Sequence, residues 1–228
     1  IGTWKGLNLY DKQACKIIPF PDTRLLDKGI NYMAADKEDN IWIGAGNTIY
    51  RCNSTASIAR EYDIFGSQQN KHVINFVYQD REGNMWVLTG GGLFRYDDKS
   101  DSFITYPPLG RNNAPYTMYQ DQSGNYWIGT WGEGLWQFFP KKEGEECYKR
   151  HHIINSRSGE TEPIFYSMTQ DNTFGYLWLL SYNELYALQY TEEGTLVSVD
   201  IHDLVDTHMM YTKIMKDREG NLWLGSYD

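Results

Sequence analysis

Asp121-Gln-Ser-Gly-Asn-Tyr-Trp127 is one of five copies of a segment that recurs along this chain of 228 residues. The other copies begin at Asp36, Asp80, Asp171 and Asp217 and end at Trp42, Trp86, Trp178 and Trp223. Successive tryptophans stand 44, 41, 51 and 45 residues apart. A period of this size indicates a repeat architecture, in which each copy is one supersecondary unit.

Each repeat contains four short apolar runs. In the third repeat they lie around Met118 and at residues 126–128, 135–139 and 148–154. These runs are too short for helices and rich in aliphatic and aromatic residues, so each predicts a strand. Four antiparallel strands in about 40–50 residues are typical of a β-propeller blade. We therefore predict an all-β propeller, with the repeated tryptophan packed between neighbouring blades.

The Asp-x-x-Gly-Asn part of each copy predicts a tight turn between the first and second strands. Gly124 and its equivalents can adopt the positive φ that such a turn requires, and the aspartate can accept backbone N–H groups of its own turn. Asp39 replaces the glycine in the first copy, and the fourth copy has one extra residue. The five aspartates and five tryptophans are therefore assigned a structural role. Three positions before each aspartate stands an apolar residue expected to face a core: Met33, Val77, Met118, Met168 and Ile214.

The start of the chain fits inside a blade. Ile1-Gly2-Thr3-Trp4 matches Ile128-Gly129-Thr130-Trp131, so residue 1 is expected within a second strand. One propeller region, 1–228, is predicted, with full blades at about 29–71, 72–113, 114–161 and 162–207 and partial blades at 1–28 and 208–228. The partial blades either belong to an arc of a larger ring, such as a seven-bladed one, or meet in a composite blade of a closed five-bladed ring. We favour the arc, because a start in mid-strand is typical of an excised piece.

Composition excludes several classes of partner and cofactor. The net charge is −9 and no basic stripe is present, which argues against a nucleic-acid partner. No apolar run has the length of a membrane span, so a membrane would be reached only through segments outside this sequence. The three cysteines, Cys15, Cys52 and Cys147, lack the spacing of a zinc site or a disulfide framework. His151-His152 belongs to a charged edge strand rather than a metal site. No metal or cofactor is expected.

The sequence of the repeat resembles the two-component regulator propeller repeat. Trp127-Ile-Gly-Thr130 followed by Gly134-Leu135 is the copy most similar to it, and residues 80–97 are nearly as similar. Leu88 and Leu180 depart from it where the family has glycine. The Gly-His and Trp-Asp pairs of the WD-repeat propellers are missing. The resemblance covers essentially the whole chain.

This resemblance implies a role in signalling. Such repeats form the extracytoplasmic sensor of hybrid two-component systems in Bacteroides-like gut bacteria, where two seven-bladed propellers precede a β-sandwich, a membrane helix and a histidine kinase. Many of these sensors respond to oligosaccharides. The resemblance therefore implies a periplasmic location, a second propeller and a β-sandwich in the same longer chain, a homodimer as one assembly, and an oligosaccharide ligand.

The predicted ligand site lies opposite the Asp-x-x-Gly-Asn turns. Loops between the second and third strands emerge on the same face as loops between blades, and propellers usually bind ligands at the mouth of the central channel. An aromatic ring can cover the apolar face of a sugar while polar groups bind its hydroxyls. The candidate ligand-binding residues on these loops are Trp4, Trp131, Tyr182, Tyr227, Arg111, Asn112 and Arg157. The alternative is that these aromatics only seal contacts between blades.

Two other functions remain open beside the non-catalytic sensor that we predict. Propellers host lyases and glycosidases, whose carboxylates converge at the channel; Glu133 and Asp203 are the candidates, although the sequence does not pair them. No Walker A, HExxH or GxSxG motif is present. A scaffold for protein partners is the third interpretation.

Overall fold

The computed structural model describes residues 1–53, 57–66, 72–110, 115–155, 158–182, 184–191, 195–201, 203–205 and 209–226. These residues form antiparallel strands and two short 3-10 turns, Thr23–Leu25 and Gly144–Cys147. The predicted all-β class is therefore confirmed. Within the described ranges, no helix has the length and apolarity to cross a bilayer. The chain divides into two compact units, Ile1–Pro108 (unit 1) and Leu109–Asp228 (unit 2).

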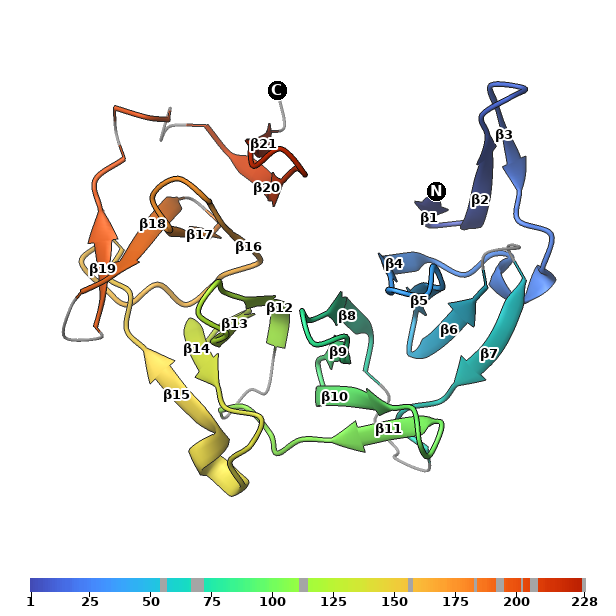
Figure 1. Ribbon diagram of the computed structural model, residues 1–228, viewed down its shortest axis with the longest axis horizontal. Helices are drawn as coiled ribbons and strands as arrows, with labels where there is room; N and C mark the ends of the chain where they lie inside the picture. Colours follow the sequence, from blue (N-terminus) through green and yellow to red (C-terminus); the bar gives the residue numbers. More distant parts are fainter. Residues whose placement is uncertain are drawn as a thin grey trace. The chain divides into compact units, whose positions relative to one another are not determined.

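Unit 1 contains one three-stranded and two four-stranded sheets, and in each sheet neighbouring strands follow one another along the chain (Figure 1, blue to green). The three-stranded sheet consists of β1 (Gly2–Thr3), β2 (Gly6–Asp11) and β3 (Lys16–Pro19). The second sheet consists of β4 (Ile30–Ala35), β5 (Ile41–Ala45), β6 (Thr48–Cys52) and β7 (Ile58–Tyr62). The third sheet consists of β8 (Ile74–Gln79), β9 (Met85–Thr89), β10 (Gly92–Asp97) and β11 (Ser102–Thr105).

Unit 2 contains two four-stranded sheets and, among its described residues, a two-stranded one (Figure 1, yellow-green to red). The first sheet consists of β12 (Pro115–Gln120), β13 (Tyr126–Thr130), β14 (Leu135–Phe138) and β15 (Tyr148–His151). The second consists of β16 (Ser167–Gln170), β17 (Leu177–Leu180), β18 (Leu185–Tyr190) and β19 (Leu196–Val199). The third consists of β20 (Tyr211–Lys216) and β21 (Leu222–Ser226). The predicted four-stranded antiparallel blades are confirmed.

The core of each unit lies between successive sheets. In unit 1, Trp42 packs in one cluster with Val77 and Met85 of the next sheet, and in unit 2, Trp127 packs with Met168 and Leu177. One small sheet cannot bury both of its faces alone, and the neighbouring sheet covers the face that carries the tryptophan. The stacking of successive sheets therefore buries Trp42 and Trp127.

Two residues of the repeat depart from the expected burial. Met33 was expected to face a core, but it is 36% exposed. Its side chain lies beside Gly2 of β1, a strand of only two residues, which covers little of β4. Trp223 of the two-stranded sheet is 59% exposed, whereas the other four repeat tryptophans are buried. Burial at these positions thus depends on the neighbouring sheet and not on the repeat alone.

Candidate functional site

The recurring segment folds into a turn that is closed by its own side chains. The indole Nε1 of Trp127 donates to Asp121 Oδ2 at 2.9 Å, and the backbone N of Asn125 donates to Asp121 Oδ1 at 2.9 Å. The indole bond recurs in every copy, at 2.7 to 2.9 Å: Trp42–Asp36, Trp86–Asp80, Trp178–Asp171 and Trp223–Asp217. Both carboxylate oxygens are therefore engaged inside the protein.

These hydrogen bonds lower the pKa of Asp36, Asp171 and Asp217. Burial by itself raises the pKa of Asp36, but hydrogen bonds from Trp42 and Asn40 outweigh it and leave that pKa below its usual value. In the exposed copy, the hydrogen bond from Trp223 lowers the pKa of Asp217 to about 2. A carboxylate that is held in this way is a structural acceptor, and it is unsuited to bind a ligand or to act as a general acid.

The opposite, loop side of unit 2 carries a group of three aromatic rings. Trp131 follows β13, with its ring 5.4 Å from that of Tyr116 at the start of β12 and 6.5 Å from that of Tyr166 just before β16. Trp131 is 47% exposed, although its backbone forms a bridge with Ile164. We call Tyr116, Trp131 and Tyr166 the aromatic row.

A β-bulge orients one member of the aromatic row. The register of the β12–β13 pair shifts between Pro115 and Thr117, so Tyr116 stands at the irregularity. The first strands of three other sheets have the same shift, at Asn31, Asn75 and Thr212. Bulges change the direction in which a side chain points and are frequent next to binding sites. The bulge position therefore presents asparagine, tyrosine or threonine, depending on the repeat.

The loop that carries Trp131 is pinned to the chain that enters the next sheet. The backbone N atoms of Gly132 and Gly134 both donate to Pro163 O, at 2.9 and 2.8 Å. The Thr130 hydroxyl donates to Gly134 O at 2.8 Å. A Cβ at Gly134, where φ is +77°, would lie 2.9 Å from Glu162 O, so this position favours glycine. The backbone on both sides of Trp131 is thus held in place.

A buried polar network lies next to this loop. Tyr186 donates from its hydroxyl to Glu184 Oε2 at 2.7 Å, and Asn155 Nδ2 donates to Glu162 Oε2 at 2.8 Å and to Tyr186 at 3.2 Å. Burial, together with the two carboxylates, raises the pKa of Tyr186, so its phenol stays protonated. The network ties the segment between β15 and β16 to β18. Its role is to position this segment.

The candidate ligand-binding residues lie in different parts of the structure. Trp131 lies at the centre of the aromatic row, and Tyr182 is exposed in the turn between β17 and β18 of the same unit. Trp4, in the turn between β1 and β2, belongs to unit 1 and is 87% exposed. The remaining candidates lie outside the described residues: Arg111, Asn112, Arg157 and Tyr227.

Sequence reasoning missed the other two members of the aromatic row. Tyr116 and Tyr166 were not among the candidate ligand-binding residues. Both stand five residues before the aspartate of their repeat, at the position where the first strand bulges in the other sheets. An aromatic residue at this fixed distance was the available signal.

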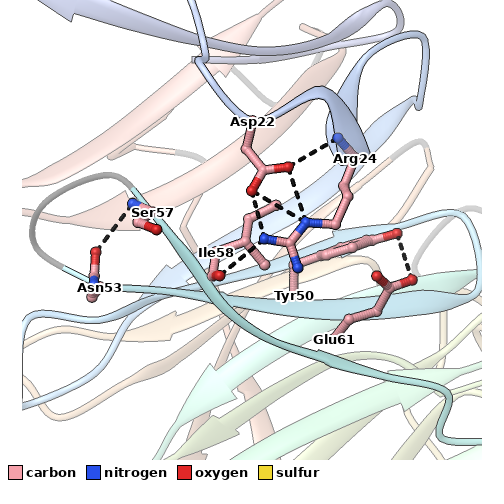
Figure 2. A network of polar contacts seen from close by, with 7 residues as sticks. All are labelled: Asp22, Arg24, Tyr50, Asn53, Ser57, Ile58 and Glu61. Carbon is pink, nitrogen blue, oxygen red and sulfur yellow. Dashed lines mark hydrogen bonds and ion pairs between the residues drawn. The ribbon is translucent and has the colours of Figure 1, made fainter.

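A second polar network, in unit 1, fixes the segment between β3 and β4 on its sheet. Figure 2 shows the Arg24 guanidinium between the Asp22 carboxylate and the carbonyl of Ile58, at 2.5 and 3.0 Å. Beside it, the Tyr50 hydroxyl donates to Glu61 Oε1 at 3.2 Å. These groups satisfy one another, so the network is structural.

Cys52 and His151 lie in packed surroundings. Cys52 is a buried free thiol, and burial raises its pKa to about 11. The ring of His151 packs edge-on against Trp127 at 5.1 Å. Within the described ranges, no three His, Cys, Asp or Glu residues are grouped in a way that could hold a metal ion.

Comparison with known proteins identifies the repeat. The family model described as two component regulator propeller matches residues 109–132 and 206–228. These two stretches match the two component regulator propeller repeat. The matched stretches contain Trp131, and they also contain the Asp217–Trp223 turn. No curated protein sequence matches the chain.

Solved structures share the fold of this chain. The extracellular domain of a putative hybrid two component system from B. thetaiotaomicron has a TM-score of 0.72 and 22% identity, covering 98% of this chain and 29% of that one. The extracellular domain of a putative one component system from the same organism has a TM-score of 0.71 and 22% identity, covering 99% and 29%. The chain therefore spans less than a third of these two proteins.

A propeller enzyme shares the fold as well. Virginiamycin B lyase from Staphylococcus aureus has a TM-score of 0.68 and 16% identity, covering 98% of this chain and 71% of the lyase. At such identities the similarity concerns the fold and not the activity. The function therefore has to be argued from the residues of the site.

Proposed function

We propose that this chain is part of the extracytoplasmic sensor region of a two-component signalling protein. In this proposal, unit 2 binds an oligosaccharide on its loop side without catalysing a reaction. The family of the repeat and the fold shared with extracellular domains of putative signalling systems support the signalling role. A periplasmic location belongs to the same proposal.

The aromatic row is the observation that carries the ligand class. Three rings from separate strands and loops lie within 5.4 to 6.5 Å of their neighbours, and the central one is about half exposed. Sugars present apolar C–H faces on which aromatic rings pack, so a row of rings fits several linked sugar units. Tyr182 supplies a further exposed ring in the same unit.

The alternative role of these aromatics is to seal blade contacts. The ring that performs this task in unit 2 is Trp127, which is fully buried. Trp131 exposes 47% of its surface while its backbone is pinned by contacts on both sides. A large aromatic side chain that is half exposed on a fixed backbone adds little to packing. Such exposed apolar surface favours a binding role.

The test is calorimetric titration of the chain with a panel of oligosaccharides released from plant and host glycans. A cognate oligosaccharide should bind, and Trp131→Ala should weaken binding by about tenfold or more, as expected for an aromatic hot spot. Phe174→Ala is the matched control, because Phe174 is an exposed aromatic in the Asp171 turn, opposite the loop side. Unchanged affinity in Trp131→Ala would remove the proposed site.

The lyase similarity defines the competing enzymatic function. Glu133, one of the two carboxylates considered for it, is buried, and its backbone N donates to the Thr130 hydroxyl at 3.0 Å. Asp203 is exposed. Incubation with the same glycan panel should leave each oligosaccharide intact. Formation of shortened or unsaturated products would favour the enzyme instead.

The partners that we propose are other parts of the same longer protein: a second propeller, a β-sandwich and the same chain in a homodimer. Light scattering on the complete extracytoplasmic region should give the mass of a monomer or a dimer. A binding partner from another gene, with no effect of any sugar on melting, would support the scaffold function.

A further inference from the structure

A pocket lies in unit 1, on the side of the Asp-x-x-Gly-Asn turns. It has a volume of about 260 Å³ and opens between the sheet β4–β7 and the sheet β8–β11. The residues that give it its chemistry are Glu38, Arg51, Gln79, Met85, Tyr96 and Asp98. None of these residues belongs to the loop-side site in unit 2.

Arg51 supplies the donors of this pocket. Its guanidinium carbon lies 5.2 Å from the ring centre of Trp42 and 5.9 Å from that of Tyr96, so the side chain is held between two rings. Among the described residues it has no ion-pair partner within 4.0 Å. A guanidinium carries five N–H donors in a fixed plane. Arg51 is therefore a positioned donor group at the wall of the pocket.

The frame of the pocket is preformed. Lys37 Nζ donates to Arg81 O at 2.8 Å and so joins the turns of the two sheets. Gln79 Nε2 donates to Gly83 O at 3.1 Å, which fixes a further wall residue. Asp36, although it lines the pocket, accepts the Trp42 indole and the Asn40 amide. The site therefore needs no rearrangement to accept a small ligand.

The remaining groups define the ligand. Glu38 and Asp98 are exposed residues whose carboxylates can accept hydrogen bonds, and the Tyr96 ring offers apolar surface. The pocket is lined by three carboxylates, of Asp36, Glu38 and Asp98, and one guanidinium, so it disfavours an anionic ligand. A volume below the roughly 300–1,000 Å³ of drug-sized ligand pockets suits one ring. We propose that this pocket binds a single neutral sugar ring, with Arg51 donating to its hydroxyls and Glu38 or Asp98 accepting from them.

The equivalent place in unit 2 is filled. Gln137 pairs with Trp127 across the strands as Arg51 pairs with Trp42. Gln137 Nε2 donates to Asn125 Oδ1 at 3.2 Å, and the rings of His151 and Tyr190 pack on Trp127 at 5.1 and 5.9 Å. The pocket therefore arises from the side chains of one blade pair and not from the repeat itself.

The test is NMR titration of the side-chain amide signal of Gln79, a pocket residue kept in every variant, with D-glucose, D-galactose, D-mannose, D-xylose and L-arabinose. We expect one or more of these sugars to shift this signal saturably, and Arg51→Gln to weaken binding about tenfold or more. Gln is the residue at the equivalent position in unit 2. Arg150→Gln is the matched control, because Arg150 lies 5.8 Å over the ring of Trp136 and does not line the pocket.

Three results would overturn the inference. They are the absence of any saturable shift with the five sugars, unchanged affinity in Arg51→Gln, and a shift produced by glycine or acetate but by no sugar. Glu38→Gln is a second variant that keeps the test decisive if Arg51→Gln unfolds. None of these results would affect the proposal that oligosaccharide binding depends on Trp131, since the two sites share no residue.

Discussion

The indole Nε1 of Trp127 donates to Asp121 Oδ2 at 2.9 Å, and both residues are buried. This bond links the turn between β12 and β13 to the ring that fills the space before the next sheet. It explains why aspartate and tryptophan recur together at a fixed distance along the chain. The most constant part of the repeat is therefore its structural part.

Removal of the indole donor should destabilise unit 2. Trp127→Phe keeps a ring in the core but takes a donor from the buried carboxylate of Asp121, and we expect a loss of about 1–3 kcal/mol in the free energy of unfolding. Urea denaturation measures it. Trp223→Phe is the matched control, because the Trp223–Asp217 bond of 2.8 Å is exposed and its loss should cost less. Equal losses in the two variants would contradict a role for burial.

The free energy of unfolding should decrease as the pH falls, because of His151. Burial, with the charges of Lys149 and His152, lowers the pKa of His151 from 6.5 to about 4, and its Nε2 is buried without a hydrogen-bond partner among the described residues. As the pH falls, the unfolded chain therefore protonates this histidine at a higher pH than the folded chain does. The contribution of His151 is fully present above pH 6.5 and is lost as the pH falls from about 6.5 to about 4.

Urea midpoints at pH 7 and pH 5 measure this effect. His151→Phe keeps a ring against Trp127 and should show a smaller loss between these pH values than the unmodified chain. His152→Gln, at the exposed neighbouring position, should keep the loss of the unmodified chain. If His151→Phe loses as much stability as the unmodified chain, another group causes the pH dependence.

Close approach between sheets should make one glycine irreplaceable. A Cβ at Gly129 would lie 2.6 Å from Phe165 O, a backbone atom, and 2.8 Å from Thr117 Cγ2. Gly129→Ala should therefore cost about 1–3 kcal/mol in the free energy of unfolding by overpacking. At Gly225, the same position of the last repeat, the nearest atom would be 3.4 Å away. Gly225→Ala should change the denaturation midpoint little, and a large effect there would contradict the packing argument.

The repeat made the blade predictable, because period and turn chemistry both act within one copy. Gly124 adopts a φ of +88°, and Asp39, which replaces glycine in the first copy, adopts +60°, as a tight turn requires. Leu88 and Leu180, which replace the glycine of the family, are buried in sheets with the predicted strands. The link from Trp127 to Asp121 was missed, since hydrogen bonds within the turn already accounted for the aspartate.

Three features of the structure could not be predicted from the apolar pattern of the repeat. Tyr116 joins the aromatic row because β12 bulges, and a bulge leaves no mark in the apolar pattern. The run predicted at residues 148–154 ends as a strand at His151, and Ile154 instead bridges Thr161 in the loop beyond. The pocket at Arg51 depends on which side chains the neighbouring blade supplies. The pocket joins segments that are far apart in sequence, whereas the bulge and the Ile154–Thr161 bridge each lie within one repeat.

Hydrogen exchange with a bound oligosaccharide tests most directly the claim that the loop side of unit 2 carries the ligand and the turn side carries the structure. With the cognate oligosaccharide, we predict slower exchange of the backbone amides at residues 130–134 and 164–166. The amides of the Asp121 turn, at 121–125, should be unchanged. Protection of 121–125 without protection of 130–134 would contradict the account.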